Sequence, residues 1–164
     1  MSSSIAVTYK VQTTVVETLG TIVPAASVKE VTHTLFNTTK TLNGTSTPPV
    51  TLHAAFEKAL SGGAATIDLT ALVGTNGIAV DGTGLRVQVL RVRNPATNAN
   101  PITIGKGASN GYTGLGASFS LALAPGAEAV ILGNDAGSDI GSGNKTLDLA
   151  GTGSQALQVE IVLG

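Results

Sequence analysis

The feature of this chain that most restricts its fold is a period-two alternation of apolar and polar residues, repeated in short runs between glycine-rich turns. Such alternation is typical of strands with one buried face. It occurs in residues 67–69, 85–89, 102–104, 119–123, 147–149 and 157–163. About eight short strands at this spacing predict an all-β fold, an antiparallel β-sandwich or jelly roll.

Residues 51–61 fit two descriptions. A helix capped by Thr51 and stopped by Gly62 would place five residues on one stripe: Leu52, Ala55, Phe56, Ala59 and Leu60. The following segment, "AATIDLTAL", has a strand pattern, however, and the intervening "SGGA" would make a hairpin loop. We therefore favour a strand for residues 51–61 and keep the helix as the alternative.

Glycine divides the chain into two parts. Only two of the 21 glycines lie in residues 1–60, where threonine and valine dominate instead. These β-branched residues favour extended strands, but their alternation is imperfect. We interpret residues 1–48 as an extended, strand-rich N-terminal arm and residues 49–164 as the sandwich domain, with the boundary in "NGTSTPP". We expect the arm to associate by adding strands to a neighbouring subunit or to a surface beneath it.

Composition favours a protein that associates with other chains. Charged residues make up 12% of the chain, about half the usual share, and the net charge is −1. Such a chain has little electrostatic repulsion to keep copies apart, and its 42% apolar content excludes a disordered protein. The negative net charge, with two tyrosines and no tryptophan, also disfavours nucleic-acid binding.

Three further classes are disfavoured by the sequence. There is no cysteine, so neither a disulfide framework nor a thiolate metal site is expected. The start, "MSSSIAVTYK", has no basic segment followed by an apolar core, so we expect no secretion signal. The longest uncharged run, residues 107–127, is interrupted by glycines and by a proline, so we expect no membrane span.

The stretch "GASNG" at residues 107–111 matches the G-x-S-x-G pattern of a hydrolase nucleophile, Ser109. A nucleophile elbow needs a helix after the serine and a histidine base placed later in the chain. Here "GYTGLGASFS" follows, and both histidines, His33 and His53, come earlier. We therefore predict a turn, no catalytic residue and no cofactor, and assign neither histidine to a metal.

The loop "NDAGSDIGSGN" is the one candidate for a cation site. Asn134, Asp135, Asp139 and Asn144 carry the oxygen ligands that calcium prefers. The spacing of a calcium-binding loop and a bidentate glutamate are both missing, and asparagine and aspartate are also common in turns. We predict no metal, and leave calcium binding by residues 134–144 as the open alternative.

All three arginines lie in "LRVQVLRVRN", residues 85–94. Strict alternation would place Arg86 opposite Arg91 and Arg93 and would expose Leu90. A β-bulge at Val89–Leu90 corrects both faults. The core residues are then Leu85, Val87, Leu90 and Val92, and the candidate interface stripe is Arg86, Gln88, Arg91 and Arg93. The alternative is a solvated face whose arginines pair with Glu160 or Asp148 on neighbouring strands.

Three long stretches carry a family resemblance: "GAATIDLTALVGTNGIAVDGTGLRVQVLRVRNP", "ITIGKGASNGY" and "NKTLDLAGTGSQALQVEIVLG". They resemble small virion proteins of tailed bacteriophages, over roughly residues 40–164. The resemblance implies a β-sandwich or jelly-roll module that decorates or cements a capsid. It also implies a virion location, on the capsid surface in preference to the tail. The implied partners are further copies of the chain, a trimer being favoured, and the major capsid protein or another virion protein.

Two alternative functions belong to other classes. One is a tail- or fibre-associated module that recognises glycans on the host surface, which the low aromatic content of 3% disfavours. The other is a hydrolase, which the missing base disfavours. We therefore expect a non-enzymatic structural virion protein, most simply a capsid cement or decoration protein.

Overall fold

A computed structural model describes residues 5–11, 15–18, 30–33, 38–74, 77–132 and 137–164. These residues form fourteen β-strands and no helix, and every pairing between the strands is antiparallel. The prediction of an all-β antiparallel fold is confirmed. No helix among the described residues could cross a membrane.

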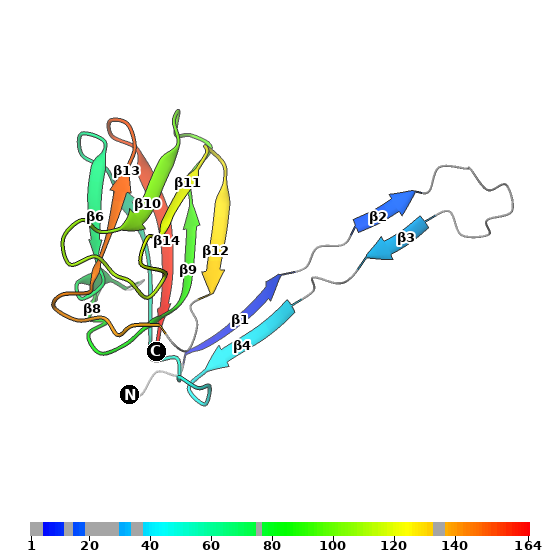
Figure 1. Cartoon of the computed structure of the whole chain (residues 1–164), viewed down its shortest axis with the longest axis horizontal. Coiled ribbons are helices and arrows are strands. Elements are labelled where there is room, and N and C mark those ends of the chain that lie inside the picture. Colours follow the sequence, from blue (N-terminus) through cyan, green and yellow to red (C-terminus); the bar gives the residue numbers. More distant parts are fainter. Residues whose placement is uncertain (1–4, 12–14, 19–29, 34–37, 75–76, 133–136) are drawn as a thin grey trace, which may run out of the picture.

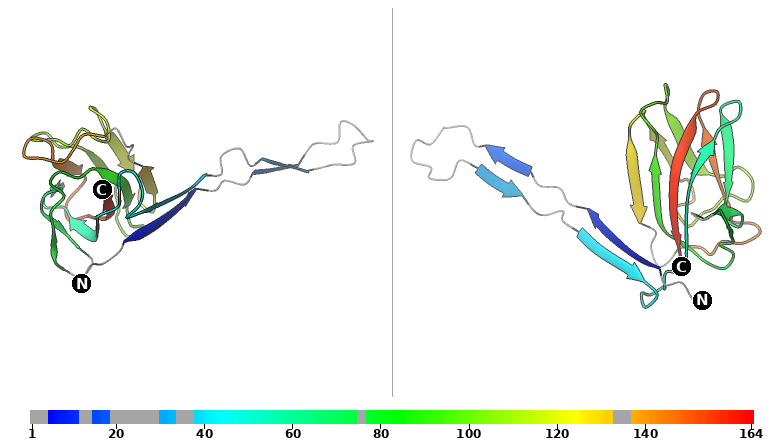
Figure 2. Two further views of the ribbon diagram at one scale, coloured as in Figure 1. Left: turned by 90° about the horizontal axis from the view of Figure 1, so that it is seen from below. Right: turned by 180° about the vertical axis from the view of Figure 1, so that it is seen from behind.

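Two four-stranded sheets face each other and form a sandwich (Figures 1 and 2). The first sheet has the order β11 (Ser120–Leu123), β10 (Ile102–Lys106), β13 (Thr146–Ala150), β6 (Ala64–Asp68). The second has the order β12 (Glu128–Leu132), β9 (Val87–Arg93), β14 (Ala156–Leu163), β5 (Leu52–Ala59). Because β5 covers most of residues 51–61, the strand prediction there is confirmed and the helix is wrong.

The main hydrophobic core lies between the two sheets. The alternating apolar positions point into it, as the period-two pattern predicts. The first sheet contributes Ile67, Ile102, Ile104, Leu123, Leu147 and Leu149. The second contributes Ala54, Val87, Leu90, Val92, Leu157, Val159, Ile161 and Leu163. Tyr112, from the loop after β10, is also fully buried, and its hydroxyl accepts a hydrogen bond from the backbone N–H of Val87 at 3.1 Å.

A β-bulge interrupts β9, as the arginine spacing predicts, but at a different residue. Val89 pairs with Val162 and Val87 pairs with Leu163, so Gln88 is the extra residue. Leu90 is fully buried in the core and Arg91 is exposed, which confirms the inferred orientation of both. The predicted position at Val89–Leu90 is wrong because Val89 faces outward and is covered there by an apolar cluster.

Two narrow ribbons lie away from the sandwich and form an extended arm (Figures 1 and 2). In the first, β1 (Ala6–Val11) pairs with β4 (Thr38–Asn43); in the second, β2 (Val15–Thr18) pairs with β3 (Glu30–His33). Each strand has a single partner in the described part of the chain. The arm therefore pairs with itself, which leaves an unpaired edge on both sides of each ribbon.

An apolar cluster holds the arm to the outer face of the second sheet. We call it the root cluster. Ile5, Val7 and Leu42 of the arm, together with Val50, pack there against Val89, Val130, Leu132 and Val162 of the sheet. Val162 is only 1% exposed, although the alternation of β14 turns it away from the core. The arm thus buries apolar side chains on a face that would otherwise be exposed to solvent.

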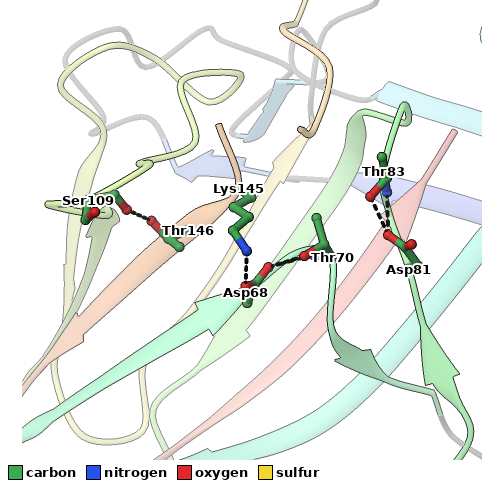
Figure 3. Close-up of polar contacts among 7 residues, drawn as sticks. All are labelled: Asp68, Thr70, Asp81, Thr83, Ser109, Lys145 and Thr146. Carbon is green, nitrogen blue, oxygen red and sulfur yellow. Dashed lines mark hydrogen bonds and ion pairs between the residues drawn. The ribbon is translucent and has the colours of Figure 1, made fainter. Parts of the chain in front are cut away.

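A last ribbon, β7 (Leu72–Val73) with β8 (Ala79–Val80), contacts the free edge strand β5. The turns around it repeat one motif. The Oδ1 atoms of Asp68 and Asp81 each accept hydrogen bonds from the N–H and hydroxyl of the threonine two residues later, Thr70 and Thr83 (Figure 3). These are Asx turns, and they account for both D-x-T sequences.

Candidate interaction surface

The outer face of the second sheet carries Arg91 and Arg93, two of the four residues of the candidate interface stripe. Strand pairing places Arg91 between Glu160 on β14 and Val130 on β12. The next outward row places Arg93 between Gln158 and Glu128. Since outward positions lie two residues apart on each strand, these side chains form two adjacent rows across the sheet.

Arg91 is the centre of an ion-pair network. Its Nε donates to Glu128 Oε1 at 2.7 Å and its Nη1 donates to Glu160 Oε2 at 3.2 Å. The second oxygen of Glu160 lies 3.1 Å from His53 Nε2. The hydrogen bond to Glu128 is the main cause that raises the pKa of Arg91, and it holds the pKa of Glu128 below its ordinary value. The pairing with Glu160 agrees with the predicted solvated face, whereas Asp148 binds Thr66 and the N–H of Ala108.

Arg93 is exposed and forms no ion pair or side-chain hydrogen bond with any described residue. Its direct neighbour Glu128 points diagonally to Arg91 instead, and its other neighbour, Gln158, is a neutral amide. A hollow of about 210 Å³ lies beside it. The lining residues are Ala55, Phe56, Arg91, Arg93, Gln158, Val159 and Glu160.

The other two members of the predicted stripe have separate environments. Arg86 precedes β9, and its Nε lies 2.5 Å from Asp139 Oδ1 in the loop before β13. Gln88 is 6% exposed, and its Nε2 donates to Pro48 O at 2.8 Å, in the connection between arm and sandwich. The structure therefore brings Arg91 and Arg93 together on one patch and assigns Arg86 and Gln88 to local contacts. Sequence reasoning missed Glu128. The signal that could have found it is the alternation along "EAVIL", which places Glu128 on the same outward face as Val130 and Leu132.

The stretch "GASNG" wraps around Thr146, the first residue of β13. The N–H groups of Gly107 and Tyr112 both donate to Thr146 O, and the N–H of Thr146 donates to Asn110 O. The Thr146 hydroxyl donates to the carbonyl of Ser109 at 2.5 Å (Figure 3). No helix follows Ser109, and the described residues show no interaction of its hydroxyl. The G-x-S-x-G match therefore corresponds to a turn that fixes β10 to β13.

The remaining candidates are only partly within the described residues. His53 contacts Glu160, and the side chain of His33 lies outside the described set. Of the calcium candidates, Asn134 and Asp135 also lie outside it. Asp139 pairs with Arg86, and Asn144 accepts a hydrogen bond from the N–H of Thr113 through Oδ1 at 2.8 Å. Within the described residues, no three acidic or histidine side chains gather as a metal site.

Asp68 carries an ion pair whose strength should depend on pH. Its Oδ2 lies 2.6 Å from Lys145 Nζ (Figure 3). Burial raises the pKa of Asp68, but the hydrogen bonds from Lys145 and Thr70 outweigh burial and hold it below 3.8. The ionised carboxylate therefore stabilises the fold above the unfolded-state pKa, and this stabilisation is lost as the pH falls through the lower folded-state pKa.

We predict that Asp68→Asn lowers the free energy of unfolding at pH 7 by less than about 1 kcal/mol, because the pair is partly exposed. The difference from wild type should narrow progressively below about pH 5. Urea unfolding at several pH values measures it. Asp81→Asn is the matched control, since Asp81 has the same threonine turn and no ion pair among the described residues. Equal losses in both variants at pH 7 would contradict a contribution from Lys145.

Comparison of the whole chain with protein-family models, with curated proteins and with solved structures gives no match.

Proposed function

We propose that this protein is a non-enzymatic structural component of a tailed-bacteriophage virion, of the capsid cement or decoration type. In this proposal copies of the chain assemble, as a trimer in the simplest case, and bind the major capsid protein or another virion protein. The arm supplies strands and the outer face of the second sheet supplies side-chain contacts.

The strand order supports a jelly-roll interpretation of the sandwich. Eight strands, counted in chain order from β5 to β14 without β7 and β8, make up the two four-stranded sheets. One sheet contains the first, eighth, third and sixth of them, and the other contains the second, seventh, fourth and fifth. Consecutive strands therefore cross between sheets repeatedly, as in paired Greek keys.

The arm is the observation that carries the proposal. Its two ribbons lie beyond the sandwich, and the only apolar cluster that joins arm to sheet among the described residues is the root cluster. A two-stranded ribbon by itself is marginally stable in water and exposes unpaired backbone groups on both edges. An extended arm of this kind gains stability when a second chain pairs with it or packs against it, which supports an assembly role.

The experiment shortens the arm and preserves its root. Replacing residues 12–37 by Asn-Gly joins Val11 to Thr38, which are direct partners, so a two-residue hairpin turn can connect them. The variant keeps the root cluster and should unfold at the wild-type temperature. We expect light scattering to give an oligomer for the full chain and a monomer for the variant, with loss of binding to virions.

A second deletion provides the control. Replacing residues 19–29 by Asn-Gly joins Thr18 to Glu30, also direct partners, and keeps β2 and β3. This variant should assemble like the full chain. If residues 12–37 can be removed with unchanged oligomeric mass and unchanged virion binding, the arm is not the assembly device. The capsid location is tested separately, by a cryo-electron microscopy reconstruction of virions that carry this chain.

A further inference from the structure

The hollow on the outer face of the second sheet is lined by two arginines and one glutamate, and the two arginines differ in their partners. Arg93 has five N–H donors, and no described residue accepts from them. Arg91 differs because Glu128 and Glu160 already accept from its guanidinium. Arg93 is therefore the arginine of this patch that can take a new acceptor without breaking an existing pair.

The acidic residue that lines the hollow does not compete for Arg93. Glu160 uses one oxygen for Arg91 and lies within hydrogen-bonding distance of His53 with the other. Gln158, opposite Arg93, is exposed and adds an amide that can donate or accept. Ala55 adds an apolar side chain on the outward face, whereas Phe56 and Val159, which also line the hollow, belong to the inward rows that pack in the core. A group that fits these neighbours has a planar acceptor pair at the end of a short apolar stem.

We propose that this hollow binds the carboxylate of a glutamate or aspartate side chain on a protein partner, with the guanidinium of Arg93 as its bidentate donor. The planar guanidinium matches a carboxylate with two parallel hydrogen bonds, and such charge-assisted pairs are among the stronger ones. The side chain's methylene groups then lie against Ala55. The inference rests on the proposed function only in taking the partner to be a protein.

The test uses the full-length protein and small probes, so it does not depend on assembly. The probe is the peptide acetyl-Ala-Glu-Ala-amide, followed by NMR through backbone amide shifts and the Nε–H signal of Arg93. We expect shifts at Ala55, Phe56, Arg93 and Gln158. The isosteric peptide with glutamine should bind about tenfold more weakly or not at all, because it loses the charge-assisted pair.

Matched charge variants identify the donor. Arg93→Gln should weaken binding of the glutamate peptide about tenfold or more, and Lys106→Gln, which removes an exposed charge from the first sheet, should leave it unchanged. Equal binding of the two peptides, or equal losses in the two variants, would overturn the proposal. Binding of methyl galacturonoside without binding of the peptide would also overturn it, in favour of an acidic glycan. Since none of these readouts measures oligomeric mass, failure here leaves the arm experiment to test the proposed function separately.

Discussion

The Leu90→Asp variant is expected to lose about 3–5 kcal/mol of its free energy of unfolding, a large part of the stability of a small domain. Leu90 is fully buried between the sheets, opposite Ile161 and Ile131 on the two neighbouring strands. A carboxylate there would have no cation and no water, so it would either remain as an unpaired charge or bind a proton at a cost. Urea unfolding followed by circular dichroism measures the loss.

Two further variants make the measurement decisive. Gln158→Asp places the same charge on the outer face, opposite Arg93, and should change stability by no more than about 0.5 kcal/mol. Leu90→Ala should lower the free energy of unfolding by about 2–5 kcal/mol. It allows the loss to be measured if the aspartate variant does not fold. If Leu90→Asp and Gln158→Asp unfold at the same urea concentration, the assignment of Leu90 to the core is wrong.

The second large effect is expected at Gly111, in the "GASNG" turn. A Cβ at this position would overlap the carbonyl oxygen of Gly107 and would lie 2.7 Å from the Cγ of Lys106. The carbonyl cannot easily move away, because the N–H of Gly107 is bonded to Thr146 and the turn is held on both sides. We expect Gly111→Ala to destabilise the protein by about 2–3 kcal/mol, as for overpacking in a closed site.

Ser109→Ala is the matched control for that variant. Ser109 is exposed, and Thr146 binds its carbonyl, which alanine retains. Stability should change by no more than about 0.5 kcal/mol. The same protein tests the absence of catalysis that we propose. Turnover in a panel of esterase and phosphatase substrates that is abolished by Ser109→Ala would contradict it, and an equal loss of stability in both variants would contradict the structural role of the glycine.

The sequence predicts the inward faces of the sandwich well because side chains in a strand alternate with a period of two. Leu157, Val159, Ile161 and Leu163 illustrate this: all four were predicted to face the core and all four are buried there. The same reasoning predicted Leu90 correctly, since only a bulge could bury it and expose Arg91. The local pattern was sufficient to predict these positions, because the surface that they pack against is the opposite sheet of the sandwich.

The errors come from contacts between segments far apart in the chain. Val162 and Val89 occupy outward positions, yet they are buried because the root of the arm packs on them. Alternation alone cannot reveal that another segment packs on the outer face of a sheet. An apolar residue at an outward position is nevertheless a sign of such packing. The missed ion pair of Arg91 with Glu128 likewise depends on the register of β12 against β9, which no local pattern specifies.

The position of β14 has a consequence for the order in which the chain can fold. This strand lies between β9 and β5 in the second sheet, and its contact between Glu160 and His53 joins residues 107 positions apart. During synthesis β5 and β9 therefore emerge from the ribosome well before the strand that separates them in the sheet. Their edges cannot reach the native pairing until the last part of the domain has been translated. Folding with such distant pairings is slow, and strand edges that remain unpaired in the meantime are prone to aggregation.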